Sequence, residues 1–357
     1  MRDPRKALAK DMTDSITLRR PDDWHLHLRD GAAMASVLPH TARQFGRAIV
    51  MPNLKPPVTT AEAAKAYHAR IKAALPAGVQ FEPLMTLYLT DNTDPAEIDR
   101  ACESEVVFGC KLYPAGATTH SDAGVTDIRR IDAVLSQMAA RGLVLQVHGE
   151  VTHETVDIFD REQRFIDEVL APTLQRHPDL RVVFEHITTA AAVDFVRSVP
   201  QRLAATITPQ HLLYNRNEIF RGGIRPHFYC LPILKTESDR EALVAAATSG
   251  DPRFFLGTDS APHARHTKEN ACGCAGMYSA HAALELYAMA FDAVGALSKL
   301  EGFASEFGAD FYRLPRHEEQ IRLIRREWAV PHVYRFGTDD IVPIAAGQSL
   351  PWQLDDA

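Results

Sequence analysis

Two histidines, His25 and His27, lie one residue apart at the end of a β-prone run that begins at Ile16. Side chains at positions i and i+2 of a strand point to the same face. Both imidazoles can therefore point at one ion, as a divalent metal requires. A single His-x-His pair is a weak signal in a chain with 16 histidines, so the hypothesis of a metal site depends on further ligands.

Further residues with metal-binding side chains end other apolar, strand-like runs. Three such runs end in His148, His186 and Asp259, and a fourth ends in Lys111. Taken singly, each has an ordinary explanation: a histidine can be a hydrogen-bonded core residue, a lysine can lie at the surface, and Asp259 can cap a helix. Four histidines, one aspartate and one lysine at matching positions favour a shared site instead.

Lys111 is the unusual member of this set, because an ammonium group cannot bind a cation. Between Cys110 and Leu112 it is expected to be buried, which is costly for an unpaired charge and lowers the pKa of the amine. A neutral amine can add CO2 to form a carbamate, an anion with two oxygens that can bridge two metals. The hypothesis is therefore that Lys111 is carbamylated, as N6-carboxylysine.

The elements that must position these residues alternate along the chain. Eight short apolar runs are expected to be strands: the run ending in the His-x-His pair, then 48–51, 82–89, 106–112, 143–147, 181–185, 203–207 and 254–258. Between them lie amphipathic stretches such as 60–75, with a capping box predicted at Thr59 and Glu62, and 128–140. The alternation predicts a (β/α)8 TIM barrel, in which the C-terminal strand ends and their candidate metal ligands converge on one mouth. A doubly wound sheet is the alternative, but no Gly-x-Gly-x-x-Gly follows the first run.

The whole chain, 1–357, is expected to be a single barrel domain. Residues 1–14 are predicted to be a flexible lead, and 320–357 an irregular C-terminal tail packed on the barrel, with Ile341–Ile344 either a late strand or a docking segment. The net charge of −7 comes without a basic stripe, which argues against a nucleic-acid partner. No apolar run approaches the roughly 18 residues of a membrane span.

The five cysteines are odd in number and follow no disulfide spacing, which predicts a reducing, cytoplasmic location. Cys272-Gly273-Cys274 is interpreted as part of a loop, because a Cys-x-Cys pair without a second pair is a weak metal or redox signal.

Seven segments contain most of the candidate residues. With further positions near residue 275, they extend from residue 23 to residue 280. They are 23–30 (DWHLHLRD), 51–54 (MPNL), 109–119 (GCKLYPAGATT), 148–150 (HGE), 184–189 (FEHITT), 208–212 (TPQHL) and 257–263 (GTDSAPH). This series resembles the amidohydrolase superfamily and, within it, the dihydroorotases of the shorter bacterial type.

The resemblance implies two zinc ions per chain. The more buried ion would be held by His25, His27 and Asp259 and the other by His148 and His186, with carbamylated Lys111 and a hydroxide as bridges. The implied reaction is the reversible cyclisation of N-carbamoyl-L-aspartate to L-dihydroorotate, the third step of pyrimidine synthesis. Asp259 would take the proton of the hydroxide and return it to the leaving nitrogen. A homodimer is also implied.

The substrate carries a carboxylate, and the forked guanidinium of Arg29 suits such a group. If the extended chain continues beyond His27, Arg29 faces the same mouth. The resemblance adds Asn53 and His263 to the carboxylate site, backbone groups of Leu231 and Ala275 as ring contacts, and Thr118 and Thr119 as the tip of a mobile lid. His211 is interpreted as a structural residue and left out of the site.

Two other functions stay open at this point. Another cyclic-amide hydrolase, of the hydantoinase or allantoinase type, would have a similar metal set; Arg29, Asn53 and His263 favour an anionic substrate over the uncharged ones of those enzymes. A non-catalytic barrel scaffold would be expected to lack the metal ligands.

Overall fold

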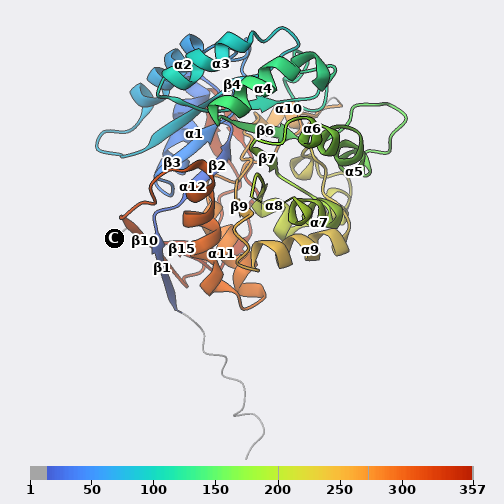
Figure 1. The fold of residues 1–357 in the computed structure, drawn as a ribbon. Coiled ribbons are helices and arrows are strands. Elements are labelled where there is room, and N and C mark those ends of the chain that lie inside the picture. The colour runs from blue at the N-terminus through green and yellow to red at the C-terminus, as the bar shows by residue number, and fades with distance from the viewer. Residues whose placement is uncertain (1–13, 200, 272, 356–357) are drawn as a thin grey trace, which may run out of the picture.

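The computed structural model describes residues 14–199, 201–271 and 273–355. Eight parallel strands follow one another in a single sheet: β2 (Asp22–Leu26), β3 (Arg47–Val50), β4 (Glu82–Tyr88), β5 (Val107–Leu112), β6 (Val144–His148), β7 (Val182–Glu185), β8 (Leu203–Ile207) and β9 (Phe254–Leu256). Just beyond β9, the Asp259 amide donates to the His25 carbonyl at 2.9 Å and the His27 amide donates to the Ser260 carbonyl at 3.1 Å. These bonds close the sheet on itself, which confirms the predicted (β/α)8 barrel (Figure 1).

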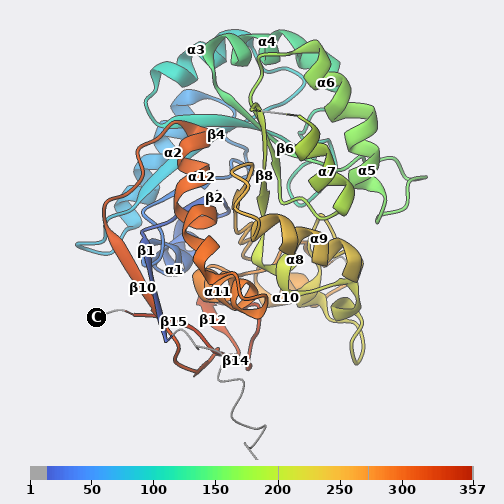
Figure 2. The same ribbon diagram turned by 60° about the horizontal axis from the view of Figure 1, so that its bottom comes forward.

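Helices surround the strands in both views (Figures 1 and 2). They are α1 (Gly31–Ala42), α2 (Ala61–Ala74), α3 (Pro95–Glu103), α4 (Asp132–Arg141), α5 (Arg161–Phe165), α6 (Ala171–Arg176), α7 (Ala190–Ser198), α8 (Pro209–Leu213), α9 (Glu237–Ala247), α10 (Arg265–Lys268), α11 (Ala283–Ala293) and α12 (Phe307–Tyr312). Every residue of β2, β3, β6, β7, β8 and β9 is buried, as expected for parallel strands packed on both sides. No helix among the described residues is long and apolar enough to cross a bilayer.

An apolar layer fills the barrel near the beginnings of the strands. Trp24 of β2 stacks on Tyr312 of α12, with ring centroids 4.6 Å apart and planes 7° from parallel. Gly308 permits this approach, because a Cβ there would lie 2.0 Å from the indole Nε1 of Trp24. Together with Phe255, these rings belong to one buried cluster. The cluster closes this end of the barrel and leaves the other end, where the strands terminate, for a site.

The predicted first strand is in fact two strands. β1 (Ser15–Arg19) is separated from β2 by Arg20 and Pro21, and proline cannot donate a hydrogen bond to a ladder. β1 pairs antiparallel with β10 (Gln320–Ile324), and β10 pairs with β15 (Gln353–Leu354), so these three strands form a separate small sheet beside the barrel (Figure 2).

The prediction of an irregular segment over 320–357 is wrong. Besides β10 and β15, it contains β11 (Trp328–Ala329), β12 (Tyr334–Phe336), β13 (Asp339–Ile341) and β14 (Ser349–Leu350). Each is short, and β10 takes its main partner from the beginning of the chain, so local sequence could not reveal the pairing. The predicted lead, apart from Asp14, lies outside the described residues, as does Cys272.

The predicted capping box does not form at the start of α2, because the residue three positions after the cap is Ala63. Thr60, not Thr59, caps α2: its hydroxyl accepts a hydrogen bond from the Ala63 amide at 3.2 Å. The carboxylate of Glu97 in α3 accepts a hydrogen bond from the Ala61 amide at 2.6 Å, so a residue from another helix satisfies a further donor of the first turn. The second predicted helix begins as a 3-10 turn (Ile128–Ile131) and continues as α4.

Candidate active site

His25, His27 and Asp259 converge at the mouth of the barrel. The Nε2 atoms of the two histidines are 3.4 Å apart, and Oδ1 of Asp259 lies 3.4 Å from that of His25 and 3.1 Å from that of His27. All three side chains are buried. Donor atoms bonded at about 2.0–2.2 Å around one tetrahedral zinc lie about 3.3–3.6 Å apart. The observed spacing therefore fits a single small divalent ion.

A second buried carboxylate, that of Asp23 in β2, binds Thr258 and so holds the loop that carries Asp259. The Thr258 hydroxyl donates to Oδ2 of Asp23 at 2.6 Å, and the Thr258 amide donates to Oδ1 at 2.9 Å. Asp259 itself has φ 43°, a left-handed conformation that a non-glycine residue adopts only when its surroundings enforce it. Burial raises the pKa of Asp23 to about 7, so this carboxylate sits in a strongly desolvating environment.

Hydrogen bonds to the Nδ1 atoms orient the first two histidines. Nδ1 of His25 lies 2.9 Å from Oε2 of Glu185, and Nδ1 of His27 lies 2.9 Å from Oδ1 of Asn53. The Thr206 hydroxyl donates to the same Glu185 oxygen at 2.6 Å. These acceptors leave each Nε2 lone pair available to an ion, as is usual for metal-binding histidines.

His148 and His186 form a second group beside the first. His148 ends β6 and His186 follows β7; their ring centroids are 4.8 Å apart, and that of His186 is 5.0 Å from that of His25. Nε2 of His148 lies 2.8 Å from Oε2 of Glu150, which leaves its Nδ1 for an ion. Nδ1 of His186 is buried and has no hydrogen-bond partner in the described part of the chain.

Lys111 of β5 is fully buried, and its Nζ has no hydrogen-bond partner among residues 14–199, 201–271 and 273–355. It lies 5.2 Å from the ring centroid of Tyr113. Burial lowers the pKa of Lys111 to about 8, although the charges of Glu185 and Asp259 oppose the shift. An isolated buried amine is costly to maintain. Converting it to a carbamate beside histidines would supply the partners that it lacks.

The cavity at this mouth contains most of the predicted site. It is lined by His25, His27, Arg29, Asn53, Tyr113, Thr118, Thr119, His148, His186, Leu231, Asp259, Ala261, Ala275 and Gly276. Of the predicted residues, only Lys111 and His263 do not line it: Lys111 lies buried in β5, and Nε2 of His263 is 3.0 Å from Nη2 of Arg29.

Arg29 reaches the cavity by a route different from the predicted one. β2 ends at Leu26 and Arg29 has φ 64°, so the chain does not continue as an extended strand. The guanidinium is instead held by Nε, which donates to the Pro262 carbonyl at 2.9 Å, and by its contact with His263. These bonds place Arg29 and His263 side by side, as a carboxylate site requires.

The segment 114–121 lies over the cavity. The Thr119 hydroxyl donates to the Ala275 carbonyl at 3.4 Å, and Nδ2 of Asn53 donates to the Thr119 carbonyl at 3.2 Å. Within the segment, the Ser121 hydroxyl donates to the Thr118 carbonyl at 2.6 Å. Its predicted opening and closing stays a prediction.

Four further residues of the site were not assigned a role from the sequence: Asp23, Glu150, Glu185 and Tyr113. Glu185 directly precedes His186, and such an acidic residue beside a histidine at a strand end was the available signal. Tyr113 is buried, lines the cavity, and carries a hydroxyl without a hydrogen-bond partner among the described residues. His211 lies away from the cavity lining, between the Thr208 hydroxyl at 2.7 Å and the Pro232 carbonyl at 3.1 Å.

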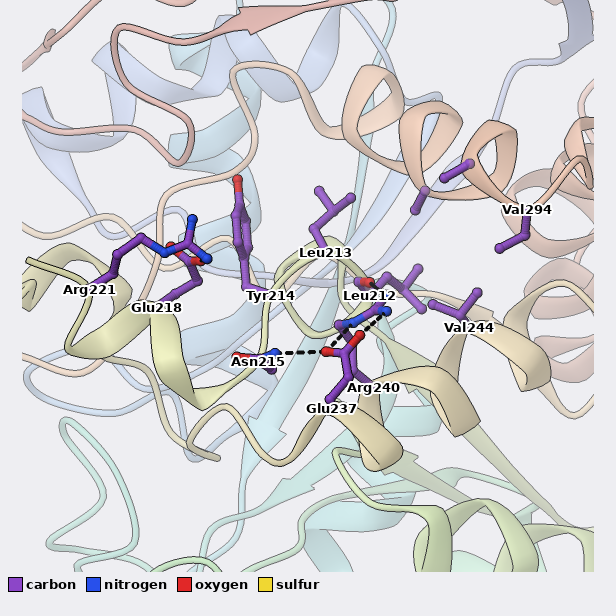
Figure 3. Close-up of a pocket in the computed structure, with 12 residues that line it drawn as sticks. Leu212, Leu213, Tyr214, Asn215, Glu218, Arg221, Glu237, Arg240, Val244 and Val294 are labelled. Atoms are coloured by element: carbon purple, nitrogen blue, oxygen red, sulfur yellow. Dashed lines mark hydrogen bonds and ion pairs between the residues drawn. The ribbon is translucent and has the colours of Figure 1, made fainter.

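A separate pocket lies outside the barrel between α8, α9 and α11 (Figure 3). Its charged side chains pair with one another: Arg221 with Glu218 and Arg240 with Glu237, both at 2.5 Å. None of the predicted site residues lines it.

The chain is similar to known proteins along nearly its whole length. Residues 23–323 match the model of the amidohydrolase family. The chain is 66% identical to a dihydroorotase of Alkalilimnicola ehrlichii over 339 residues, which is 95% of this chain and 99% of the relative. It is 65% identical to one of Cupriavidus pinatubonensis over 342 residues, 96% and 99% of the two chains.

Solved structures of dihydroorotases are also similar to this chain along nearly its whole length. The dihydroorotase of Campylobacter jejuni has a TM-score of 0.88 at 35% identity, covering 96% of this chain and 98% of that one. The dihydroorotase of Saccharomyces cerevisiae in complex with 5-fluoroorotic acid has a TM-score of 0.89 at 32% identity, covering 96% and 99%. An L-hydantoinase of Arthrobacter aurescens, with a TM-score of 0.75 at 15% identity over 95% of this chain and 87% of that one, shares the fold alone.

Proposed function

The chain belongs to the dihydroorotases of the amidohydrolase family, and we propose that it catalyses the reversible cyclisation of N-carbamoyl-L-aspartate to L-dihydroorotate and water, the third step of pyrimidine synthesis. One observation carries the proposal: a buried His25–His27–Asp259 cluster shares a cavity with Arg29, which contacts His263. A metal-type centre thus lies beside a cationic group suited to an anionic cyclic amide.

The amidohydrolase family is metal-dependent, and we propose two zinc ions per chain. One would be held by His25, His27 and Asp259, the other by His148 and His186, with carbamylated Lys111 shared between them. The donor spacing of the first group and the unpartnered atoms of Lys111 and His186 support this assignment. When bound, such ions polarise an amide carbonyl and lower the pKa of an attacking water.

Asp259 is proposed to move the proton. Burial raises its pKa, but electrostatic interaction with His25 and a hydrogen bond from His27 outweigh burial and hold the pKa at about 2. The carboxylate is therefore ionised at neutral pH and ready to accept a proton. In ring opening, Asp259 takes a proton from the attacking water and returns it to the leaving ring nitrogen. In ring closure, the same residue carries the proton in the opposite direction.

Arg29 and His263 are proposed to bind the substrate carboxylate together with Asn53. Asn53 already contacts His27 and the lid, so it would link the carboxylate, the metal-binding histidine and the lid. Backbone groups of Leu231 and Ala275 would contact the ring. Thr118 and Thr119 would cover the bound substrate and exclude water.

A small molecule is the proposed substrate partner, and a homodimer is the proposed assembly. The four described cysteines, Cys102, Cys110, Cys230 and Cys274, are free thiols, which supports the proposal of a reducing, cytoplasmic location. Arg29 with His263 argues against a hydantoinase-type or allantoinase-type activity, because those substrates lack the carboxylate that these side chains suit.

An assay of ring opening and ring closure with purified protein tests the proposal. We expect turnover of dihydroorotate and of N-carbamoyl-aspartate, no comparable turnover of hydantoin, and loss of activity with a chelator that zinc restores. Faster turnover of hydantoin, or activity that survives complete removal of metal, would overturn it.

A further inference from the structure

Lys268, the last residue of α10, has a buried ammonium group that binds backbone only. The side chain is 4% exposed. Its Nζ donates to the carbonyls of Tyr229 at 3.0 Å, Cys274 at 2.8 Å and Gly276 at 2.6 Å. These three acceptors match the three protons of an ammonium group. No described carboxylate lies within ion-pair distance, so a buried charge is balanced only by peptide dipoles.

The three carbonyls belong to the two loops that carry the proposed ring contacts. Ala275 lies between Cys274 and Gly276, and Leu231 lies two residues after Tyr229. The Gly276 amide also donates to the Tyr229 carbonyl at 3.0 Å, which joins the two loops directly. Both Leu231 and Ala275 line the cavity. Lys268 therefore sits at the junction of the two segments that form this wall.

The geometry of the peptide bond connects Lys268 to the cavity. In a trans peptide the C=O and the N–H point in opposite directions. A Cys274 carbonyl bound to Lys268 therefore turns the Ala275 N–H away from the ammonium. A hydrogen bond from a charged donor also polarises the amide, which makes its N–H a stronger donor on the other side.

The same wall is packed tightly against the proposed carboxylate site. A Cβ at Gly276 would lie 2.7 Å from Cβ of Ala261 and 3.0 Å from Cδ2 of His263. Gly276 also has φ 145°, which a residue with a side chain adopts only at a cost. A shift of this segment would therefore displace His263 as well as Ala275.

We propose that Lys268 is a positioning residue for substrate: its ammonium fixes the backbone around Ala275 and beside Leu231, and so sets the wall that meets the ring and the carboxylate. The inference rests on the proposed function for the identity of the ligand. Lys268 does not touch the substrate, and its loss should affect binding more than the chemical step.

The test compares Lys268→Met with Lys235→Met. Lys235 is also 4% exposed, but its Nζ has one carbonyl partner, that of Ile233 at 3.1 Å, so it controls for loss of a buried ammonium. We expect Lys268→Met to raise KM for dihydroorotate about tenfold or more, with a smaller change in kcat and unchanged zinc content. Lys235→Met should lower thermal stability and leave KM near the wild-type value.

Hydrogen exchange provides a readout that needs no turnover. Lys268→Met should exchange faster in peptides covering 229–231 and 274–276, and at the wild-type rate in peptides covering 25–27. Weaker binding of orotate, measured by calorimetry, should accompany this change. If the wild-type protein fails to turn over dihydroorotate, the proposed function fails, whereas unchanged exchange and unchanged orotate binding in Lys268→Met overturn the role of Lys268.

A pH series on protein with Lys268 intact covers the case in which the variant does not fold. Burial lowers the pKa of Lys268 to about 8, with Cys230, Cys274, Arg29, His227 and His263 as the neighbouring titratable groups. Burial also raises the pKa of Cys230 to about 12, and a Cys274→Ser background removes the other thiol. KM should then rise as the pH passes through 8, because the amine loses the charge that strengthens its hydrogen bonds. A flat KM between pH 7 and 9 would count against the proposal.

Discussion

The two halves of the proposed metal site differ in how completely the chain itself forms them. In the first half, the donor atoms of His25, His27 and Asp259 already lie 3.1–3.4 Å apart, and Glu185 and Asn53 orient the two rings. In the second half, Nδ1 of His186 and Nζ of Lys111 have no partner among the described residues. Within the described part of the chain, a cluster of three donors is formed in the first half and not in the second. Under the proposed function, modification of Lys111 and binding of the ions would complete the second half.

Asp259→Asn should have the largest effect, because it removes both a donor of the first half and the proposed proton carrier. Loss of a positioned general acid–base typically costs about 10²–10⁴ in rate, and loss of a metal ligand adds to this. We expect turnover to fall by at least about 10³ in both directions. Stopped-flow or coupled assays of ring opening and closure measure it, and a variant within tenfold of wild type would remove Asp259 from the chemistry.

Lys111→Ala tests the second half of the proposed metal site. The second half should lose its ion, whereas the first half keeps His25, His27 and Asp259. Elemental analysis should therefore give about one zinc per chain instead of about two, together with loss of activity. Short carboxylic acids should partly restore both by supplying the missing oxygens. Two zinc ions per chain in an active Lys111→Ala variant would contradict the carbamate role.

The same contrast separates what the sequence predicted from what it did not. His25 and His27 could be identified because they lie at a strand end, where periodicity indicates the direction of a side chain. Arg29 and Asp259 were also predicted, but both reach the cavity from left-handed positions beyond a strand end, which periodicity does not describe. Asp23 and Lys268 bind residues on other strands or loops, which no local pattern encodes. The place of Glu185 beside His186 gave a signal, but not its partner His25 on another strand. The β1–β10–β15 sheet was missed for the same reason, because its strands come from opposite ends of the chain.

The proposed lid, segment 114–121, can be tested without changing either half of the metal site. Changing Thr118→Ala and Thr119→Ala together removes the hydroxyls of two residues that line the cavity, and with them the bond from Thr119 to Ala275. We expect turnover to fall about 10²-fold with unchanged zinc content, because closure positions the reacting groups and excludes water. Limited proteolysis should also show that ligand protects the segment in the wild type. Normal turnover in the double variant would leave an ordinary surface loop.

Arg29→Met tests whether the metal centre and the carboxylate site are independent. Loss of a charge-assisted hydrogen bond costs about 1.5–3 kcal/mol, which corresponds to about one to two decades in binding. KM for dihydroorotate should rise accordingly, with zinc content at the wild-type value. Calorimetric titration with orotate measures the same loss without turnover. Normal handling of dihydroorotate would place the carboxylate site elsewhere and favour a hydantoinase-like substrate.

The smallest expected effect comes from the two carboxylates that hold one histidine in each half. Glu185 contacts His25 at 2.9 Å and Glu150 contacts His148 at 2.8 Å, so Glu185→Gln and Glu150→Gln form a matched pair. Loss of such a partner typically costs about 10–100-fold in metal affinity, and glutamine, which keeps one acceptor oxygen, should stay near the lower limit.

The Thr206 hydroxyl donates to Glu185 and its oxygen accepts from the His186 amide at 2.7 Å, so Glu185 is also linked to the second half. Timed zinc release into a chelator should therefore show two phases in the wild type. Glu150→Gln should accelerate only the faster one, from the half that the chain leaves incomplete. Glu185→Gln should accelerate both. If zinc release showed a single phase and both substitutions accelerated it equally, the two halves of the metal site would not differ in how firmly they hold zinc.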